Sequence, residues 1–200
     1  LEQTFCKCYC TDNQINWTTV DTNDISKIPN FTLNPKDRCY HCKKWIFEHI
    51  ISTGNKLYGF KTVMEGSNID DLGDYRPGLL ALKELQIVSP FIACGLTKKD
   101  IRELSRELNL PTSDKPSSPC LATRIPYGVE ITSDKLKIIE NSEELLHHLG
   151  ITNCRVRCDS NTARIEISLS DFDIVLANRE KITDYLHQHG FTYVSLDLDG

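Results

Sequence analysis

A proline-rich stretch from Leu110 to Gly128 divides the sequence into two parts with different patterns. It has neither helical nor strand periodicity, and it holds Pro111, Pro116, Pro119 and Pro126 among several serines and threonines. Long irregular loops inside compact domains are usually functional segments or linkers. We therefore expect loop 110–128 to carry a site, within a first domain of residues 1–128 that precedes a second domain of residues 129–200.

The first part alternates predicted strands with predicted helices. β-Branched and aromatic residues favour the strands, while Asn34 before Pro35 and Thr97 before Asp100 favour helix starts. The expected strands are 15–21 and 60–65, and the expected helices are 34–52, with Gly54 as its stop, 77–85 and 97–108. This alternation indicates an α/β domain with a parallel sheet, in which ligands bind beyond the carboxyl ends of the strands.

The second part has the pattern of a small α+β unit. Its expected order is a helix over 133–148, strands over 153–159 and 162–169, a helix over 171–187 and a strand over 191–198.

Composition excludes several classes of protein. The chain has 23 Lys and Arg against 28 Asp and Glu, a net charge of −5, and a general nucleic-acid binder needs a basic face instead. No apolar stretch approaches the roughly 20 residues of a membrane helix, and residues 1–12 lack a signal-peptide pattern. The 9 cysteines are an odd number in a long chain, which indicates reduced thiols. We expect a cytoplasmic protein without nucleic-acid or membrane partners.

Small and acidic residues follow the predicted strand 60–65. Gly66 allows a tight turn, and Asn68, Asp70 and Asp71 offer oxygen atoms to a ribose, an adenine edge or a water-bound Mg²⁺. The same residue types also make ordinary turns. Both interpretations, a nucleotide-binding loop and a simple turn, stay open.

Cys39 and Cys42 lie three residues apart in a predicted helix and therefore share one face. This spacing is common in metal and redox sites. However, the apolar stripe of the helix continues along the same face, and no second Cys-x-x-Cys completes a zinc site. From the residues alone, a packed pair is favoured over a ligand pair.

Cys120 lies in the irregular loop between two cations, Lys115 and Arg124. A thiol that is exposed beside positive charge is a good nucleophile. The polar, proline-rich surroundings make a buried structural cysteine less plausible, so Cys120 is a candidate nucleophile.

Arg155 and Arg157 share one face of the predicted strand 153–159 because side chains alternate along a strand. Two neighbouring guanidinium groups repel each other unless an anion joins them, and a phosphate or carboxylate fits their fork geometry. The alternative is an ion pair with Glu166 on the next strand.

Three motifs together resemble the LarE family: DRCYHCK at 37–43, EGSNIDDLGDYRPG at 65–78 and PCLATRIPYG at 119–128. The resemblance implies an ATP-dependent sulfur transferase of the PP-loop ATP pyrophosphatase superfamily. Such enzymes convert pyridinium-3,5-biscarboxylic acid mononucleotide to its thiocarboxylate form, a step towards the nickel-pincer nucleotide cofactor.

The resemblance also implies residue roles. ATP, with Mg²⁺, would adenylylate a substrate carboxylate, and Cys120 would donate its sulfur and become dehydroalanine. The implied substrate-binding residues are Arg124, Glu143, Arg155 and Arg157. In similar proteins three cysteines hold a [4Fe–4S] cluster instead, and here these would be Cys39, Cys42 and Cys120.

One family feature is absent: the sequence has no Ser-Gly-Gly-x-Asp-Ser phosphate-binding loop. We therefore expect an N-terminally truncated PP-loop domain (adenine nucleotide alpha hydrolase-like) plus the small α+β domain, ending short of the family's C-terminus. Such a chain would hydrolyse little ATP.

The resemblance further implies a homo-oligomer. Alternatives are an amidating or RNA-thiolating PP-loop enzyme, or a non-catalytic iron–sulfur or metal-binding protein.

Overall fold

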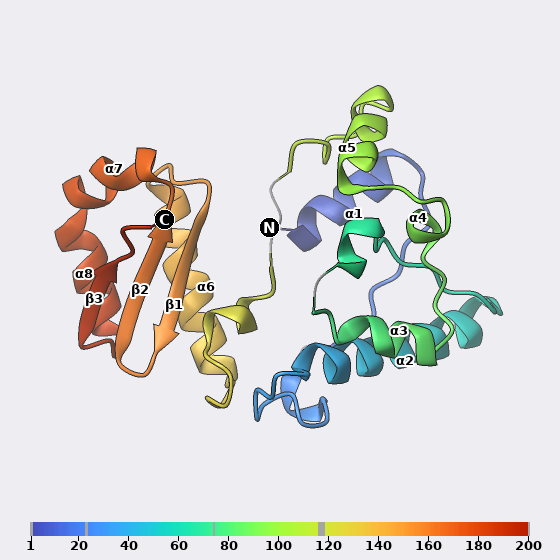
Figure 1. Cartoon of the computed structure of the whole chain (residues 1–200), viewed down its shortest axis with the longest axis horizontal. Coiled ribbons are helices and arrows are strands. Elements are labelled where there is room, and N and C mark those ends of the chain that lie inside the picture. The colour runs from blue at the N-terminus through green and yellow to red at the C-terminus, as the bar shows by residue number, and fades with distance from the viewer. Residues whose placement is uncertain (1, 23, 74, 116–118, 200) are drawn as a thin grey trace.

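The computed structural model describes residues 2–22, 24–73, 75–115 and 119–199. The helices are α1 (Glu2–Asp12), α2 (Arg38–Tyr58), α3 (Gly78–Glu84), α4 (Pro90–Ala93), α5 (Lys98–Glu107), α6 (Ser133–His148), α7 (Phe172–Ala177) and α8 (Arg179–Gln188). The strands are β1 (Cys154–Asp159), β2 (Thr162–Ile167) and β3 (Tyr193–Leu196). Helices α1 to α5 lie beside the part that contains the sheet and α6 to α8 (Figure 1).

The sheet is small and mixed. Strand β1 pairs antiparallel with β2, and β2 pairs parallel with β3, in the order β1-β2-β3. The antiparallel pair is a hairpin, whereas the parallel pair needs the crossover through α7 and α8. The described residues thus form an α/β structure with one three-stranded sheet.

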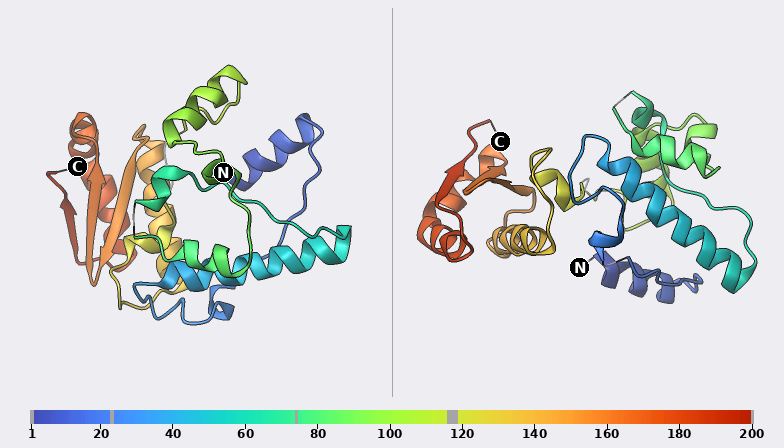
Figure 2. Two further views of the ribbon diagram at one scale, coloured as in Figure 1. Left: turned by 45° about the vertical axis from the view of Figure 1, so that its right-hand side comes forward. Right: turned by 90° about the horizontal axis from the view of Figure 1, so that it is seen from below.

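One face of this sheet supplies the main core. Along β1 the buried and partly exposed residues alternate, so Cys154, Val156 and Cys158 face inward while the two intervening arginines face outward. Helices α6 and α8 lie together on the inward side (Figure 2, right) and contribute Ile139 and Leu186, among others, to the same apolar cluster. The expected alternation in 153–159 is confirmed, and the arginine face is left uncovered by these helices.

The parallel sheet expected in residues 1–128 is not formed by the described residues. The predicted strand 15–21 has no strand hydrogen bonds and is almost wholly exposed, and the predicted strand 60–65 is reduced to one parallel bridge between Met64 and Val88. β-Branched residues stabilise a strand only where a neighbouring strand accepts its hydrogen bonds and a core covers its side chains. Neither condition is met at 15–21.

Helix α2 begins and ends later than predicted. Asn34 is not its N-cap: it has a left-handed backbone with φ of 52°, and the helix begins at Arg38. Gly54 lies inside the helix, which ends instead at Gly59, whose φ of 69° is the conformation of a glycine C-cap.

Several other helix predictions are confirmed. Thr97 and Asp100 form the expected capping box of α5, and α6 spans the predicted 133–148. The predicted helix 171–187 is divided at Asn178 into α7 and α8, because the backbone leaves helical geometry there. Among the described residues, no helix has both the length and the apolar character needed to span a membrane.

The central strand provides a test of the core. Ile165 on β2 is 2% exposed, so Ile165→Ala removes buried apolar surface and leaves a cavity. We expect it to lower the free energy of unfolding by about 2–5 kcal/mol, measured by urea denaturation. Leu169→Ala is the matched control because Leu169 is 67% exposed. Equal effects of the two changes would contradict the described core.

Candidate active site

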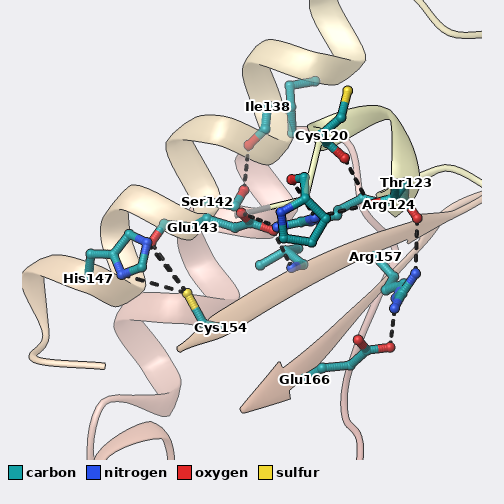
Figure 3. A network of polar contacts seen from close by, with 12 residues as sticks. Cys120, Thr123, Arg124, Ile138, Ser142, Glu143, His147, Cys154, Arg157 and Glu166 are labelled. Carbon is teal, nitrogen blue, oxygen red and sulfur yellow. Dashed lines mark hydrogen bonds and ion pairs between the residues drawn. The ribbon is translucent and has the colours of Figure 1, made fainter. Parts of the chain in front are cut away.

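Cys120 sits at the start of a short helical turn, η3 (Leu121–Arg124), and is exposed. Its carbonyl oxygen accepts hydrogen bonds from the amide of Thr123 at 2.9 Å and from the hydroxyl of the same residue at 2.8 Å. These bonds hold the backbone of Cys120 while its sulfur stays accessible. The sulfur points away from the buried polar groups beneath the loop (Figure 3).

A buried ion pair between Arg124 and Glu143 lies under this turn. The guanidinium Nε and Nη2 donate to the two carboxylate oxygens at 2.7 and 3.0 Å, and both side chains are at most one-tenth exposed. Nη1 donates to the carbonyl of Pro119 and to the hydroxyl of Thr123. The carboxylate also accepts the amide of Val156 at 3.0 Å. All three guanidinium nitrogens are therefore used within the protein.

In this structure the charged groups of two predicted substrate-binding residues have protein partners. Arg124 and Glu143 were expected to contact substrate, but their charged groups bind each other and the surrounding backbone. Arg124 was also expected to lie beside the thiol of Cys120, whereas its guanidinium is directed to Glu143 (Figure 3). The ammonium of Lys115, the other expected neighbour, lies 5.9 Å from the ring centre of Phe5.

Arg155 and Arg157 lie on the outward face of β1, as predicted, but they have different surroundings. Arg157 donates to Glu166 at 2.7 Å and to the carbonyl of Thr123 at 2.9 Å. Arg155 has no hydrogen bond or ion pair with any residue that the structure describes. The predicted ion pair with Glu166 is therefore made by Arg157, and Arg155 has no such partner among the described residues.

Two open pockets flank these arginines. Arg155 lines one of about 290 Å³ together with Asn153 and Ser168. Arg157 lines another of about 400 Å³, which also contains Thr123 and Arg164. Because Thr123 is three residues from Cys120, the second pocket opens beside the loop that carries the thiol.

Cys39, Cys42 and Cys120 come from two separate segments that approach each other. Cys39 and Cys42 lie in the first turns of α2, and Cys42 interacts electrostatically with both of the other thiols. Burial, with smaller contributions from Cys120 and Cys39, raises the pKa of Cys42 to about 11. Among the described residues, however, no three His, Cys, Asp or Glu side chains are arranged to hold a metal ion.

The predicted nucleotide loop is held largely by its own side chains. Asn68 and Asp71 form a capping box around η2 (Ile69–Leu72), and Asp71 also pairs with Arg76 at 2.8 Å. Asp70 accepts the amide of Lys98 at 2.8 Å but is exposed. Gly66 has room for a Cβ and no left-handed backbone. Asp74 of the second motif and residues 116–118 of loop 110–128 lie outside the described residues.

Sequence reasoning missed the contact between the loop and the segment before α2. The side-chain amide of Asn34 donates to the carbonyls of Ile125, Pro126 and Val129 at 3.3, 2.7 and 3.0 Å. Its oxygen accepts a bond from Arg38 at 2.6 Å. The only signal in the sequence was the tolerance of asparagine for left-handed backbone, and the following proline favoured a helix cap instead.

Comparison with known proteins identifies relatives along most of the chain. No protein-family model matches it. It is 40% identical over 186 residues to the uncharacterized protein slr1717 of Synechocystis sp., which covers 90% of the chain and 68% of that protein. It is 38% identical over 175 residues to the uncharacterized protein MJ0830 of Methanocaldococcus jannaschii, covering 88% and 68%.

A third relative is named as an enzyme. The chain is 32% identical over 188 residues to the pyridinium-3,5-bisthiocarboxylic acid mononucleotide synthase of Lactiplantibacillus plantarum, which covers 93% of the chain and 66% of that protein. The chain therefore spans about two thirds of the length of each of these relatives.

The buried ion pair predicts a large effect of one substitution. Glu143→Gln leaves the Arg124 charge buried without a counter-charge, so we expect the free energy of unfolding to fall by about 3–5 kcal/mol in urea denaturation. Glu180→Gln breaks the exposed pair of Arg179 and Glu180 and is the control, with an expected change below about 0.5 kcal/mol. Similar shifts for both variants would show that the Arg124–Glu143 pair is not buried in solution.

The pKa of Cys42 predicts its reactivity. Because that pKa is raised to about 11, little thiolate is present near neutral pH, and the alkylation rate should increase about tenfold per pH unit from pH 7 to pH 10. The measurement is mass spectrometry of iodoacetamide-treated protein, with the exposed Cys94 in the same digest as a reagent control. A Cys42 rate that levels off below pH 9 would contradict this environment.

Proposed function

The chain belongs to the protein family that includes slr1717 and MJ0830, and from this membership and its similarity to the named synthase we propose that it is a LarE-type sulfur transferase. Its substrate is a pyridinium-3,5-biscarboxylic acid mononucleotide, and its product carries sulfur on a carboxyl group. The proposal rests most directly on one observation: the exposed thiol of Cys120 lies on a loop whose backbone is tied to both neighbouring parts of the molecule.

The proposed reaction uses ATP and Mg²⁺ as partners of the small-molecule substrate. A substrate carboxylate attacks ATP and forms an acyl adenylate, and pyrophosphate leaves. The thiolate of Cys120 then attacks the acyl carbon and displaces AMP, which gives a thioester. Loss of the Cα proton with cleavage of the Cβ–S bond leaves a thiocarboxylate on the substrate and dehydroalanine at position 120.

The arginines of the sheet support recognition of an anionic substrate. Arg155 carries a charge without a protein partner among the described residues, and Arg157 lines a pocket that reaches Thr123 of the cysteine loop. Guanidinium groups bind phosphate and carboxylate through paired hydrogen bonds. We assign Arg155 to direct contact with a substrate anion and Arg157 to the wall of the adjoining pocket.

Arg124 and Glu143 have a supporting role in this proposal. Their buried pair holds η3 against α6 and β1, which fixes the turn that begins at Cys120. A nucleophile held in one geometry reacts faster because less freedom is lost on reaching the transition state. These residues therefore act on the reaction through the loop.

The loop 66–71 is the proposed nucleotide contact. The side chains of Asn68 and Asp71 are occupied in capping η2, so the exposed groups of Gly66 and Asp70 are the ones available to a nucleotide or a hydrated Mg²⁺.

A [4Fe–4S] cluster on Cys39, Cys42 and Cys120 is the alternative sulfur source. Cysteine thiolates are the ligands that such clusters take, and Cys39 and Cys42 lie one turn apart on α2. A cluster bound there would supply the sulfur and leave Cys120 intact, which mass spectrometry distinguishes from the sacrificial reaction.

Mass spectrometry of the peptide that contains Cys120 tests the proposal. The whole protein is incubated without oxygen with ATP, Mg²⁺ and the biscarboxylic mononucleotide. We expect thiolated product, released pyrophosphate and conversion of Cys120 to dehydroalanine in equal amounts. Cys120→Ser should abolish the product, while Cys94→Ser, which removes another exposed thiol, should leave it unchanged.

Other results discriminate between mechanisms. Thiolated product beside an intact Cys120 would overturn the sacrificial step and support the cluster. An intact Cys120 with neither product nor pyrophosphate would overturn the sulfur transferase itself.

A further inference from the structure

A clamp formed by Asn34 and Arg38 joins the segment before α2 to the loop that carries Cys120. We infer that these are positioning residues: they hold loop 119–129 against the start of α2 and so set the position of Cys120 relative to that helix. The inference rests on the proposed function only in taking Cys120 as the reacting thiol.

Asn34 binds the loop through both its side chain and its backbone. Its side chain is 0% exposed, and its amide nitrogen lies within hydrogen-bond distance of three loop carbonyls. Its own carbonyl accepts the amide of Gly128 at 2.9 Å. An amide group supplies two donors and a carbonyl oxygen, and here both ends are used. The left-handed backbone of Asn34, with φ of 52°, is the conformation that turns the side chain to the loop.

Arg38 is a buried cation whose side-chain contacts are made to Asn34 and to the loop. It is 4% exposed and is the first residue of α2, where the helix dipole disfavours a positive charge. No described carboxylate forms an ion pair with it. Its guanidinium contacts the Asn34 oxygen at 2.6 Å and the ring of Tyr127, whose centre lies 4.5 Å from the guanidinium carbon. A buried cation is costly, and both of these contacts lead to the loop or to the residue that binds it.

The clamp joins the two segments that carry the cysteines, namely the start of α2 and the loop with Cys120. Arg38 directly precedes Cys39, and Cys42 follows one turn later on the same helix. Cys120 directly precedes η3, and the carbonyls of Ile125 and Pro126 just after that turn accept the bonds from Asn34. Loss of the clamp removes the side-chain bonds to 125–129, and the position of Cys120 relative to α2 then depends on the remaining backbone bonds.

Cross-linking between Cys42 and Cys120 measures this position without ATP or substrate. The whole protein with Cys39→Ser is treated with a short bis-maleimide at pH 8, and the readout is the ratio of Cys42–Cys120 cross-link to reagent attached at Cys120 alone. Asn34→Gly keeps the left-handed backbone accessible and removes only the side chain. We expect it to lower the ratio at least fivefold.

Asn34→Asp separates the two halves of the clamp. Aspartate also tolerates a left-handed backbone and keeps an acceptor for Arg38, but it lacks the donors to the loop carbonyls. We expect the same loss as for Asn34→Gly. If Asn34→Asp keeps the wild-type ratio, the loop carbonyl contacts do not position Cys120 and the inference is overturned.

Two further variants distinguish positioning from stability. Ile165→Ala weakens the sheet core at a residue that makes none of the clamp's hydrogen bonds, so it should lower the urea midpoint and leave the ratio unchanged. Arg38→Met should lower the ratio, and Arg38→Lys, which keeps the cation, should restore part of it even if the Asn34 variants fail to fold. An equal loss in Ile165→Ala, or no loss in Arg38→Met, would overturn the inference.

Because the cross-link needs no turnover, its result is independent of the proposed reaction. A clamp confirmed in a protein that makes no thiolated product would leave the positioning role intact and remove only its catalytic meaning.

Discussion

The buried ion pair of Arg124 and Glu143 is the contact on which the arrangement of the site depends. It joins the turn after Cys120 to helix α6, and through the amide of Val156 it also reaches β1. Two charges in an apolar interior are tolerated because every guanidinium nitrogen and both carboxylate oxygens have partners. Moving the turn away from α6 would leave both charges unpaired, so the loop and the sheet part are energetically coupled.

Two other contacts complete the hold on the loop. Arg157 binds the carbonyl of Thr123 from the sheet, and Asn34 binds the carbonyls around Pro126 from the helical part. The loop thus receives side-chain donors from both parts of the molecule, although it has almost no regular structure of its own. Irregular backbone has unpaired carbonyls, and these donors satisfy them. The loop backbone is thus held in place while the thiol of Cys120 stays exposed.

The outward face of the sheet shows how one strand pattern serves two purposes. Alternation buries Cys154 and Val156 and presents both arginines on the other side. Glu166 pairs with both Arg157 and Arg164, whereas Arg155 has no such partner among the described residues. The core therefore fixes which face of β1 carries the two guanidinium groups.

The sequence alone determined the features that depend on near neighbours in the chain. Capping by Thr97, the extent of α6 and the alternation of β1 were predicted because each follows from residues a few positions apart. Local pattern also marked Cys120 as a thiol in an irregular loop. It misjudged 15–21, where strand propensity finds no neighbouring strand.

Only the tertiary structure decided the partners that lie far apart in sequence. Arg124 pairs with Glu143, and Asn34 leaves its predicted cap position to bind a loop about 90 residues away. A side chain with several possible partners takes the one that packing brings within reach, and burial makes that choice costly to reverse.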